Sequence, residues 1–407
     1  MPELQPFRGI RYKRSDQLAD IVCPPYDVIS QEDQQRLHAR HPHNAVHLEL
    51  THKGDHREPY ELVASRFEQW LSSGVLQQDP EPGFYVYRQD FILGGQSHSV
   101  MGVIGALGLE EAGTGVLPHE RTMPGPVTDR LELMRACPVN VSPIYAIYRG
   151  GGALRPLYEK LLAEAPDVHF RDDARILHRL WRVLDAARVD EISSALAPGL
   201  LVIADGHHRF ETALAFHREM EGKPGGHGAV MCFCVDASSE DLVVLPYHRA
   251  LKADVAPREV AERIKDAYSV SELGSGDLSA ALTESGADHP FVFLVDGSSL
   301  LVEVPAEAVR AKIGDRPSAW AALDVVALHE AVLPEVLGPG ACREMRFSTD
   351  ALEVARLVDE GWTAGVLLRP VHPVDVIEVA RSGERMPEKA SYFWPKAVTG
   401  LVFRLLR

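Results

Sequence analysis

The sequence contains no long hydrophobic run, and none of its apolar stretches approaches the roughly 18 residues that span a bilayer. Its first residues, MPELQPFRGIRYKRSDQ, lack the apolar centre of a signal peptide. Five cysteines, odd in number and scattered, argue against a disulfide framework and predict reduced thiols. Cys232 and Cys234 lie on one side of an apolar strand and are interpreted as core residues rather than zinc ligands. We therefore expect a cytoplasmic protein with no membrane partner.

Basic charge is also scarce. The chain has 42 lysines and arginines against 58 aspartates and glutamates, which gives a net charge of −16. Nucleic acid needs a basic face, so this charge argues against it as a partner but leaves room for one basic pocket that binds a phosphorylated small molecule. Neither a Walker-type glycine loop nor a Rossmann fingerprint occurs, so no motif identifies a nucleotide.

Composition and patterning predict a globular fold of mixed α/β or α+β class. At 407 residues the chain exceeds one minimal core. Its hydrophobic content of 45% and charged content of 25% are close to the globular average. Strand-like and helical stretches alternate along it. We expect an N-terminal α+β segment at 1–115, a core at 116–250 and a C-terminal α+β segment at 251–407.

Local signals predict several elements. Ser30 followed by acidic residues predicts a helix over 31–40. The alternating stretch AVHLEL predicts a strand over 45–50, and helical spacing predicts helices over 60–76 and through HRLWRVLDAARVDEISSAL. FYVYRQDFIL and SVMGVIGALGL, separated by a Gly-Gly turn, predict a β-hairpin.

In LVIADGHHRFETAL, a short apolar strand runs into Asp-Gly-His-His-Arg and then into a helical pattern. A glycine turn between a strand and a helix is typical of an anion site, because backbone N–H groups and the helix dipole converge there. Gly206 permits the tight turn, and Arg209 can bind two phosphate oxygens. His207 and His208 add donors whose charge adjusts near neutral pH. Capping and a solvated arginine are the structural alternative, but four polar residues within five positions favour a binding site.

Asp205 needs a different role, because a carboxylate repels a bound phosphate. It could orient a histidine, hold a magnesium ion beside the phosphates or accept a proton from the substrate. A zinc or iron site is a rival interpretation, which would join Asp205 and the adjacent histidines with His119 and Glu120. The histidines lack the i, i+4 spacing of zincins, and the nearby arginine opposes a cation, so phosphate is favoured.

Other ionisable clusters supply supporting candidates. The loop PHERTMPGPVTDR contains Glu120 as a candidate general base and Arg130 as a candidate phosphate ligand, with a salt-bridged surface loop as the alternative. VLPYHRAL repeats the pattern of an apolar strand followed by basic residues, so His248 and Arg249 are expected to form a second basic pair. The lysines of MPEKASYFWPK are candidate pocket charges.

The stretches PFRGIRY, PPYDVIS, HPHNAVHLEL, ADGHHRFETA and RMPEKASYFWPKAVTGL are spread over nearly the whole chain. On these stretches the sequence resembles a large uncharacterised microbial family, domain of unknown function 1015. That family has no accepted activity, so this resemblance implies no particular reaction.

The DGHHR core is similar to the phosphate-binding turn of the ParB/sulfiredoxin-like superfamily, which includes free-serine kinases that use a separate glutamate as base. The resemblance implies a ParB/sulfiredoxin-like core in which Asp205–Arg209 form that turn, with Mg²⁺ and a nucleotide (ATP or ADP) as cofactors. Glu120 would be the corresponding glutamate. The sulfiredoxin cysteine has no counterpart in ADGHHR, and the acidic net charge disfavours the DNA-switch role of other members.

The leading hypothesis is phosphoryl transfer involving a small hydroxylated metabolite, with free serine or phosphoserine as the first substrate to test. The turn would bind the transferred phosphate, and Glu120 or Asp205 would accept the hydroxyl proton. Three alternatives stay open. They are a phosphatase that uses a histidine as acid or nucleophile, a non-catalytic nucleotide-binding regulator, and a metal-dependent hydrolase.

Overall fold

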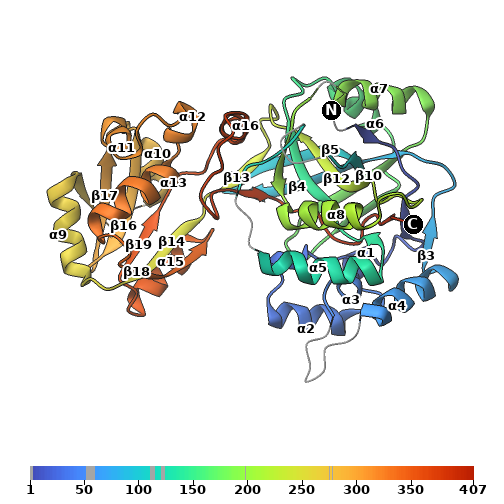
Figure 1. Cartoon of the computed structure of the whole chain (residues 1–407), viewed down its shortest axis with the longest axis horizontal. Coiled ribbons are helices and arrows are strands. Elements are labelled where there is room, and N and C mark those ends of the chain that lie inside the picture. The colour runs from blue at the N-terminus through green and yellow to red at the C-terminus, as the bar shows by residue number, and fades with distance from the viewer. Residues whose placement is uncertain are drawn as a thin grey trace. The chain divides into compact units, whose positions relative to one another are not determined.

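The computed structural model describes residues 3–51, 60–110, 115–120, 124–197, 199–274, 276 and 278–407. The chain forms two compact units, and Figure 1 shows their elements. Unit 1 comprises residues 1–118, 122–242 and 395–407, and unit 2 comprises 119–121 and 243–394. The segments expected at 1–115 and 116–250 thus both contribute to unit 1, and the end of the chain returns to it. No local sequence signal marks this return.

Unit 1 combines one large mixed sheet with surrounding helices. Its strands are β1 (Leu4–Gln5), β2 (Ile10–Tyr12), β3 (Leu76–Gln78), β4 (Phe84–Leu93), β5 (Gln96–Gly108), β6 (Val116–Pro118), β7 (Val139–Asn140), β8 (Ile144–Tyr148), β9 (Val168–Arg171), β10 (Leu177–Val183), β11 (Leu201–Asp205), β12 (Ala229–Asp236) and β21 (Arg404–Leu405). Its helices are α1 (Leu18–Ile21), η1 (Tyr26–Val28), α2 (Gln31–Arg40), α3 (Val46–Glu49), α4 (Tyr60–Ser72), α5 (Pro124–Ala136), α6 (Arg155–Leu162), α7 (Ala186–Leu196) and α8 (His207–Glu219).

The order of strands in the large sheet is β6-β11-β8-β12-β5-β4-β10-β9, with β1 paired to β5. β11 is parallel to β6 and antiparallel to β8, and β8 is parallel to β12. The remaining neighbours, from β12 to β9, are antiparallel. As a result, β11 and β5 end, and β8 and β4 begin, at the same end of the sheet.

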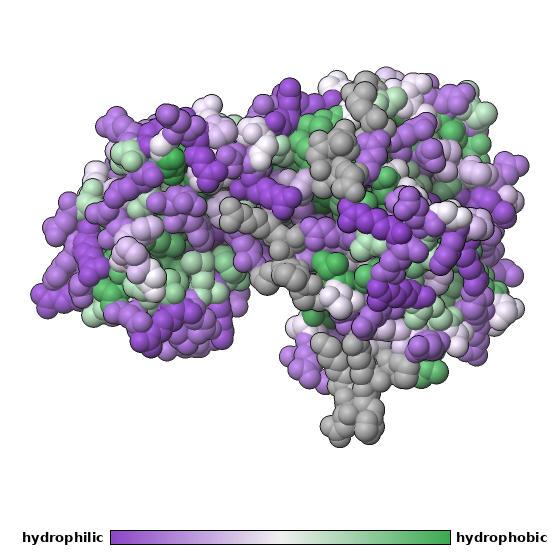
Figure 2. Space-filling view, viewed as in Figure 1, coloured by the Kyte–Doolittle hydropathy of each residue, from purple (hydrophilic) through white to green (hydrophobic). Residues whose placement is uncertain are grey.

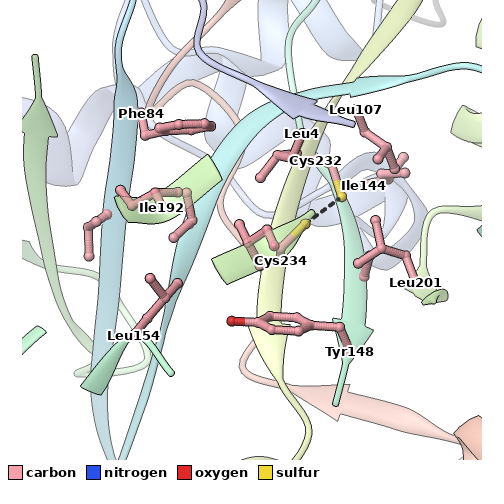
Figure 3. Packing of buried hydrophobic residues seen from close by; sticks show 14 of the residues in the cluster. Leu4, Phe84, Leu107, Ile144, Tyr148, Leu154, Ile192, Leu201, Cys232 and Cys234 are labelled. Atoms are coloured by element: carbon pink, nitrogen blue, oxygen red, sulfur yellow. Dashed lines mark hydrogen bonds between the residues drawn. The ribbon is translucent and has the colours of Figure 1, made fainter. Parts of the chain in front are cut away.

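A large core cluster of unit 1 lies on one face of this sheet, and the other face is also buried, with Tyr85 and Phe233 fully covered. Alternation in the strands directs Phe84, Val86 and Trp181 into the cluster. Figure 3 shows Cys232 and Cys234 of β12 within this core, with their Sγ atoms 3.5 Å apart. Both thiols are buried, which confirms their predicted packing role.

Several predicted elements are confirmed and two are wrong. Helix α2 has the predicted bounds, and the Ser30 hydroxyl accepts a hydrogen bond of 3.1 Å from Asp33 N. The hairpin is formed by β4 and β5. AVHLEL forms helix α3 rather than a strand. The first part of HRLWRVLDAARVDEISSAL forms β10, because pairing with β4 and β9 on both sides overrides its helical spacing.

Unit 2 is a smaller α+β unit. Its strands are β13 (Val243–Leu245), β14 (His248–Ala253), β15 (Ser269–Leu273), β16 (His289–Val295), β17 (Ser298–Val304), β18 (Cys342–Ser348), β19 (Ala364–Leu367) and β20 (Tyr392–Trp394). Its helices are α9 (Pro257–Ala267), α10 (Leu278–Glu284), α11 (Ala306–Ile313), α12 (Ser318–Ala321), α13 (Asp324–Val326), η2 (Ala327–Val332), α14 (Leu333–Val336), α15 (Ala351–Asp359) and α16 (Pro373–Arg381).

The main sheet of unit 2 is antiparallel, with strand order β15-β17-β16-β19-β14-β18. Leu282 of α10 and Leu357 of α15 pack with Val292 and Leu367 of the sheet into a buried cluster. The two units together confirm the predicted mixed α+β class. On the face drawn in Figure 2, hydrophilic residues predominate and apolar residues appear in small patches. In the described parts of the chain, no helix is both long and apolar enough to cross a bilayer.

Candidate functional site

The Asp-Gly-His-His-Arg motif lies where β11 ends and α8 begins, and α8 is labelled in Figure 1. Gly206 is the N-cap of α8 and has a φ of +86°, a left-handed conformation that favours glycine. A Cβ at this position would lie 2.9 Å from Arg209 Nε and 3.0 Å from its Cζ. Glycine is therefore required twice, for the turn and for the close approach of the guanidinium.

A carboxylate and two cations form a buried cluster at this turn. Asp205 Oδ2 accepts a hydrogen bond of 2.7 Å from Arg209 Nη2, and Asp205 Oδ1 accepts one from Lys396 Nζ. Arg209 Nη1 donates to the carbonyl oxygen of Pro143. Burial alone would raise the pKa of Asp205, but Lys396 and Arg209 lower it to about 2. Asp205 therefore stays ionised. Lys396 and Arg209 together carry two positive charges against its single negative charge.

This pairing restricts the chemistry of Asp205. Because both of its oxygens are bound by cations, a magnesium ion would have to displace a guanidinium or an ammonium group to coordinate it. A carboxylate with a pKa of about 2 is also a weak proton acceptor at neutral pH. The magnesium and proton-accepting roles expected of Asp205 stay predictions, and either one would require these ion pairs to be broken. In the described part of the chain, no three histidine, cysteine or acidic side chains are grouped to hold a metal ion.

A small cavity of about 50 Å³ lies beside Arg209. Three residues that line it each have one buried polar atom without a hydrogen-bond partner among the described residues, namely Glu49 Oε2, Arg209 Nε and Thr212 Oγ1. Such atoms are normally satisfied by water or by a ligand. The cavity is therefore a subsite lined largely by apolar residues such as Leu133 and Val230, with an acidic wall, a cationic wall and one hydroxyl group.

Glu49 is the acidic wall of this subsite. It is 3% exposed and hydrogen-bonds to Ser142. Arg130 Nη1 donates to the backbone oxygen of Glu49 at 2.6 Å and lies 4.0 Å from its Oε1. Burial raises the pKa of Glu49, and the charges of Arg130 and Arg209 oppose this shift only in part. A carboxyl group with a raised pKa is suited to exchanging a proton closer to neutral pH.

The residues expected to form the site fall into both units. Asp205–Arg209 and Arg130 belong to unit 1, where Arg130 and Arg209 line the same cavity. Glu120, His248 and Arg249 belong to unit 2. The catalytic and binding roles of all these residues stay predictions. Within unit 1, Arg130 lies next to the motif, because it lines the same cavity as Arg209.

In unit 2, His248 and Arg249 are buried together at the start of β14. The Arg249 guanidinium donates to the carbonyl oxygens of Tyr247 and Lys389, the latter at 2.9 Å. Burial lowers the pKa of Arg249 to about 9, although the charge of Glu120 opposes this. Burial and the Arg249 charge lower the pKa of His248 to about 4. Backbone carbonyls rather than a carboxylate hold this arginine.

Sequence patterns do not single out Glu49, Ser142 or Thr212. The available signal for Glu49 is a glutamate within the apolar run AVHLEL, because a buried acid needs polar partners. In the strand that was incorrectly predicted for this run, Glu49 falls on the polar face, so its burial is not expected. Lys396, in contrast, is one of the lysines expected as pocket charges, and it contacts Asp205.

A family described as proteins of unknown function, DUF1015, has a sequence model that matches residues 4–326. The chain belongs to this family. The match confirms the resemblance to domain of unknown function 1015 and includes the Asp205–Arg209 motif. No curated protein matches the chain significantly.

Similarity to solved structures is weak. A free serine kinase in complex with AMP is 14% identical, with a TM-score of 0.35 over 70% of this chain and 88% of that chain. A conserved hypothetical protein from Pyrococcus furiosus is 16% identical, with a TM-score of 0.35 over 72% and 92%. SbnI from Staphylococcus aureus, with a C-terminal truncation, is 9% identical, with a TM-score of 0.37 over 73% and 85%. At these scores the ParB/sulfiredoxin-like core and the kinase activity stay predictions.

Proposed function

We propose that unit 1 transfers a phosphoryl group between a phosphorylated small molecule and the hydroxyl group of a small metabolite. The observation that carries this proposal is Arg209, whose guanidinium touches the Gly206 turn and lines the cavity that contains Glu49. Phosphoryl transfer depends mainly on positioning and on stabilising negative charge. Because Arg209 lies beside both the turn expected to bind the phosphoryl group and the cavity for the acceptor hydroxyl, it can help to position these two groups and to stabilise negative charge.

The phosphoryl group would bind at the first turn of α8. Gly206 has no side chain to cap the helix, and the helix dipole favours an anion there. Arg209 and Lys396 supply positive charge in excess of Asp205. Because both Nη atoms of Arg209 are engaged, we assign it electrostatic stabilisation rather than the bidentate binding expected from the sequence. No step is assigned to a magnesium ion at Asp205.

The acceptor hydroxyl would occupy the cavity beside Arg209. A hydroxyl group can accept a hydrogen bond from Arg209 Nε and donate one to Glu49 Oε2, which are both without a partner among the described residues. The raised pKa of Glu49 suits it to take the hydroxyl proton as the phosphoryl group is transferred. Free serine is the first acceptor to test, with ATP or ADP as donor, since a cavity of about 50 Å³ suits a hydroxymethyl group.

The test incubates the full chain with ATP or ADP and either serine or alanine, and follows phosphoserine by phosphorus NMR. We expect product with serine only. Glu49→Gln should lower the rate by about 100-fold or more, because general base catalysis typically contributes that much. Glu61→Gln, at an exposed position of α4, is the matched control and should leave the rate unchanged.

Three other outcomes would contradict the proposal, and two of them would favour one of the alternative functions. Phosphate released from phosphoserine without a nucleotide would indicate a phosphatase, with water in the place of the acceptor hydroxyl. Nucleotide binding without product after long incubation would indicate a regulator. Unchanged turnover in Glu49→Gln would show that the cavity is not the acceptor site.

A further inference from the structure

Two pairs of histidines in unit 1 face each other through their Nδ1 atoms. His38, near the end of α2, and His47, in α3, have Nδ1 atoms 2.9 Å apart. His217, in α8, and His227 have Nδ1 atoms 3.1 Å apart. Either distance is that of a hydrogen bond, but the second nitrogens and the ring orientations show that the two pairs are of different kinds.

The second nitrogens of His38 and His47 determine where their protons lie. His38 Nε2 lies 2.9 Å from the carbonyl oxygen of Leu50, and His47 Nε2 lies 3.3 Å from that of His41. A carbonyl oxygen can only accept a hydrogen bond, so each Nε2 carries the one proton of its neutral ring. Both Nδ1 atoms are then bare acceptors, and their lone pairs repel at 2.9 Å. The pair therefore requires a cation between its rings, either an additional proton or a metal ion.

The pair of His217 and His227 requires no such cation. His227 Nε2 donates to the carbonyl oxygen of Lys223 at 2.9 Å, so its Nδ1 is an acceptor. Among the described contacts of His217, no carbonyl oxygen faces its Nε2, so His217 can carry its proton on Nδ1 and donate it to His227. Two neutral rings thus account for this pair.

The ring orientations distinguish the pairs in the same way. A ring nitrogen lies about 1.2 Å from its ring centre, so a linear hydrogen bond of about 3 Å places two ring centres about 5.3 Å apart. The centroids of His217 and His227 are 5.3 Å apart. Those of His38 and His47 are only 4.4 Å apart, with an interplanar angle of 89°. The His38 and His47 rings are therefore bent toward each other and do not form an in-line hydrogen bond.

The bent arrangement matches that of two ligands of one metal ion. Two rings that converge symmetrically at these separations have axes that meet about 2.2 Å from each Nδ1, at an angle of about 80°. Imidazole nitrogens bind transition-metal ions at about 2.0–2.1 Å. The angle is close to that between neighbouring positions of a square-planar or octahedral complex. Metal-binding histidines also typically donate their second N–H to a backbone carbonyl, as both rings do here.

Two further histidines of the same stretch have other contacts. His41 Nδ1 accepts a hydrogen bond of 3.0 Å from His43 N, and the His43 ring packs edge-on against Trp70. Within the part of the chain that the structure describes, no group of three histidine, cysteine or acidic side chains could hold a metal ion. His38 and His47 would therefore supply two ligands and leave the other coordination positions to water.

We propose that His38 and His47 bind a divalent transition-metal ion, of the type of Ni²⁺ or Cu²⁺, through both Nδ1 atoms in neighbouring coordination positions. Imidazole suits these ions, whereas Mg²⁺ prefers oxygen ligands. The ion neutralises the repulsion between the lone pairs and links α2 to α3. Neither histidine lines the cavity beside Arg209, so this proposal and the proposed transfer reaction can fail independently.

The test titrates the full chain, prepared without a histidine tag, with Ni²⁺ and with Mg²⁺ by calorimetry. Ni²⁺ should bind and raise the melting temperature, and Mg²⁺ should do neither. His38→Gln and His47→Gln should each weaken Ni²⁺ binding by about tenfold or more, since the loss of even a supporting residue costs that much. Glutamine keeps an N–H donor for the backbone carbonyl. His217→Gln is the matched control, because it removes an imidazole from the in-line pair, and it should leave Ni²⁺ binding unchanged.

A spectroscopic measurement tests the ligands directly. Electron paramagnetic resonance of the chain with one equivalent of Cu²⁺ should show two imidazole nitrogens, and His47→Gln should leave one. Three results would overturn the proposal. They are no binding of Ni²⁺ or Cu²⁺ at millimolar concentration, equal loss of Ni²⁺ binding in His47→Gln and His217→Gln, and a Cu²⁺ spectrum that His47→Gln does not change. The first of these would identify an additional proton as the cation between the rings.

Discussion

Arg209 in unit 1 and Arg249 in unit 2 follow similar sequence patterns but have opposite electrostatic environments. Each follows a histidine near an apolar strand, and each is largely buried. Asp205 contacts Arg209, and this carboxylate, with Asp27 and Glu49 nearby, raises the arginine pKa despite burial. Arg249 donates to backbone carbonyls, and burial lowers its pKa to about 9. The carboxylate partner, rather than the His-Arg pattern, determines whether the pKa of the buried arginine is raised or lowered.

The largest expected effect comes from removing that partner. Asp205→Asn should destabilise unit 1 by about 3–5 kcal/mol, because it leaves Arg209 and Lys396 as buried, uncompensated cations. Urea unfolding monitored by hydrogen exchange in each unit measures the effect. Glu120→Gln in unit 2 is the comparison. It weakens one hydrogen bond to Lys389 N and should cost about 1 kcal/mol. Equal losses of unfolding free energy in the two variants would contradict the proposed difference between the environments of Arg209 and Arg249.

The units should also differ in their response to acid. Burial lowers the pKa of His248 and of His329 in unit 2 to about 4 from 6.5. Because the unfolded chain takes up protons first, stability present above pH 6.5 is lost as the pH falls toward 4, by roughly 3 kcal/mol for each histidine. The contribution of Asp205 in unit 1 is present above pH 3.8 and is lost as the pH falls through 2.

Melting curves of both units between pH 7 and pH 3 check this difference. His329→Gln should flatten the response of unit 2 and leave that of unit 1 unchanged. If the units lost stability together over the same pH range, the assignment to these histidines would be contradicted.

A smaller effect is expected at the turn itself. Gly206→Ala should cost about 1–2 kcal/mol for the left-handed backbone and more for the contact of its Cβ with the Arg209 guanidinium. Gly222→Ala has a similar φ of +77° but meets no atom within 4 Å, so it should show the backbone cost alone. The difference between the two variants, measured by urea unfolding, gives the cost of displacing Arg209. No difference would mean that the guanidinium moves freely.

Local signals predicted those features that depend on neighbouring residues. Ser30 identified the start of α2, and the Gly-Gly turn identified the hairpin of β4 and β5. The motif at Asp205–Arg209 correctly placed a strand, a glycine turn and a helix. AVHLEL and HRLWRV were predicted incorrectly, because short apolar stretches fit both periods and their packing partners lie far away in the sequence.

The sequence by itself therefore determined the α+β class, the buried thiols of Cys232 and Cys234, and the glycine turn before α8, since propensity and hydrophobic alternation act over a few residues. Only the tertiary structure decided that Lys396 pairs with Asp205 and that Glu49 shares a cavity with Arg209. These contacts join residues distant in the chain, and burial, which sets their pKa values, exists only after the chain has folded.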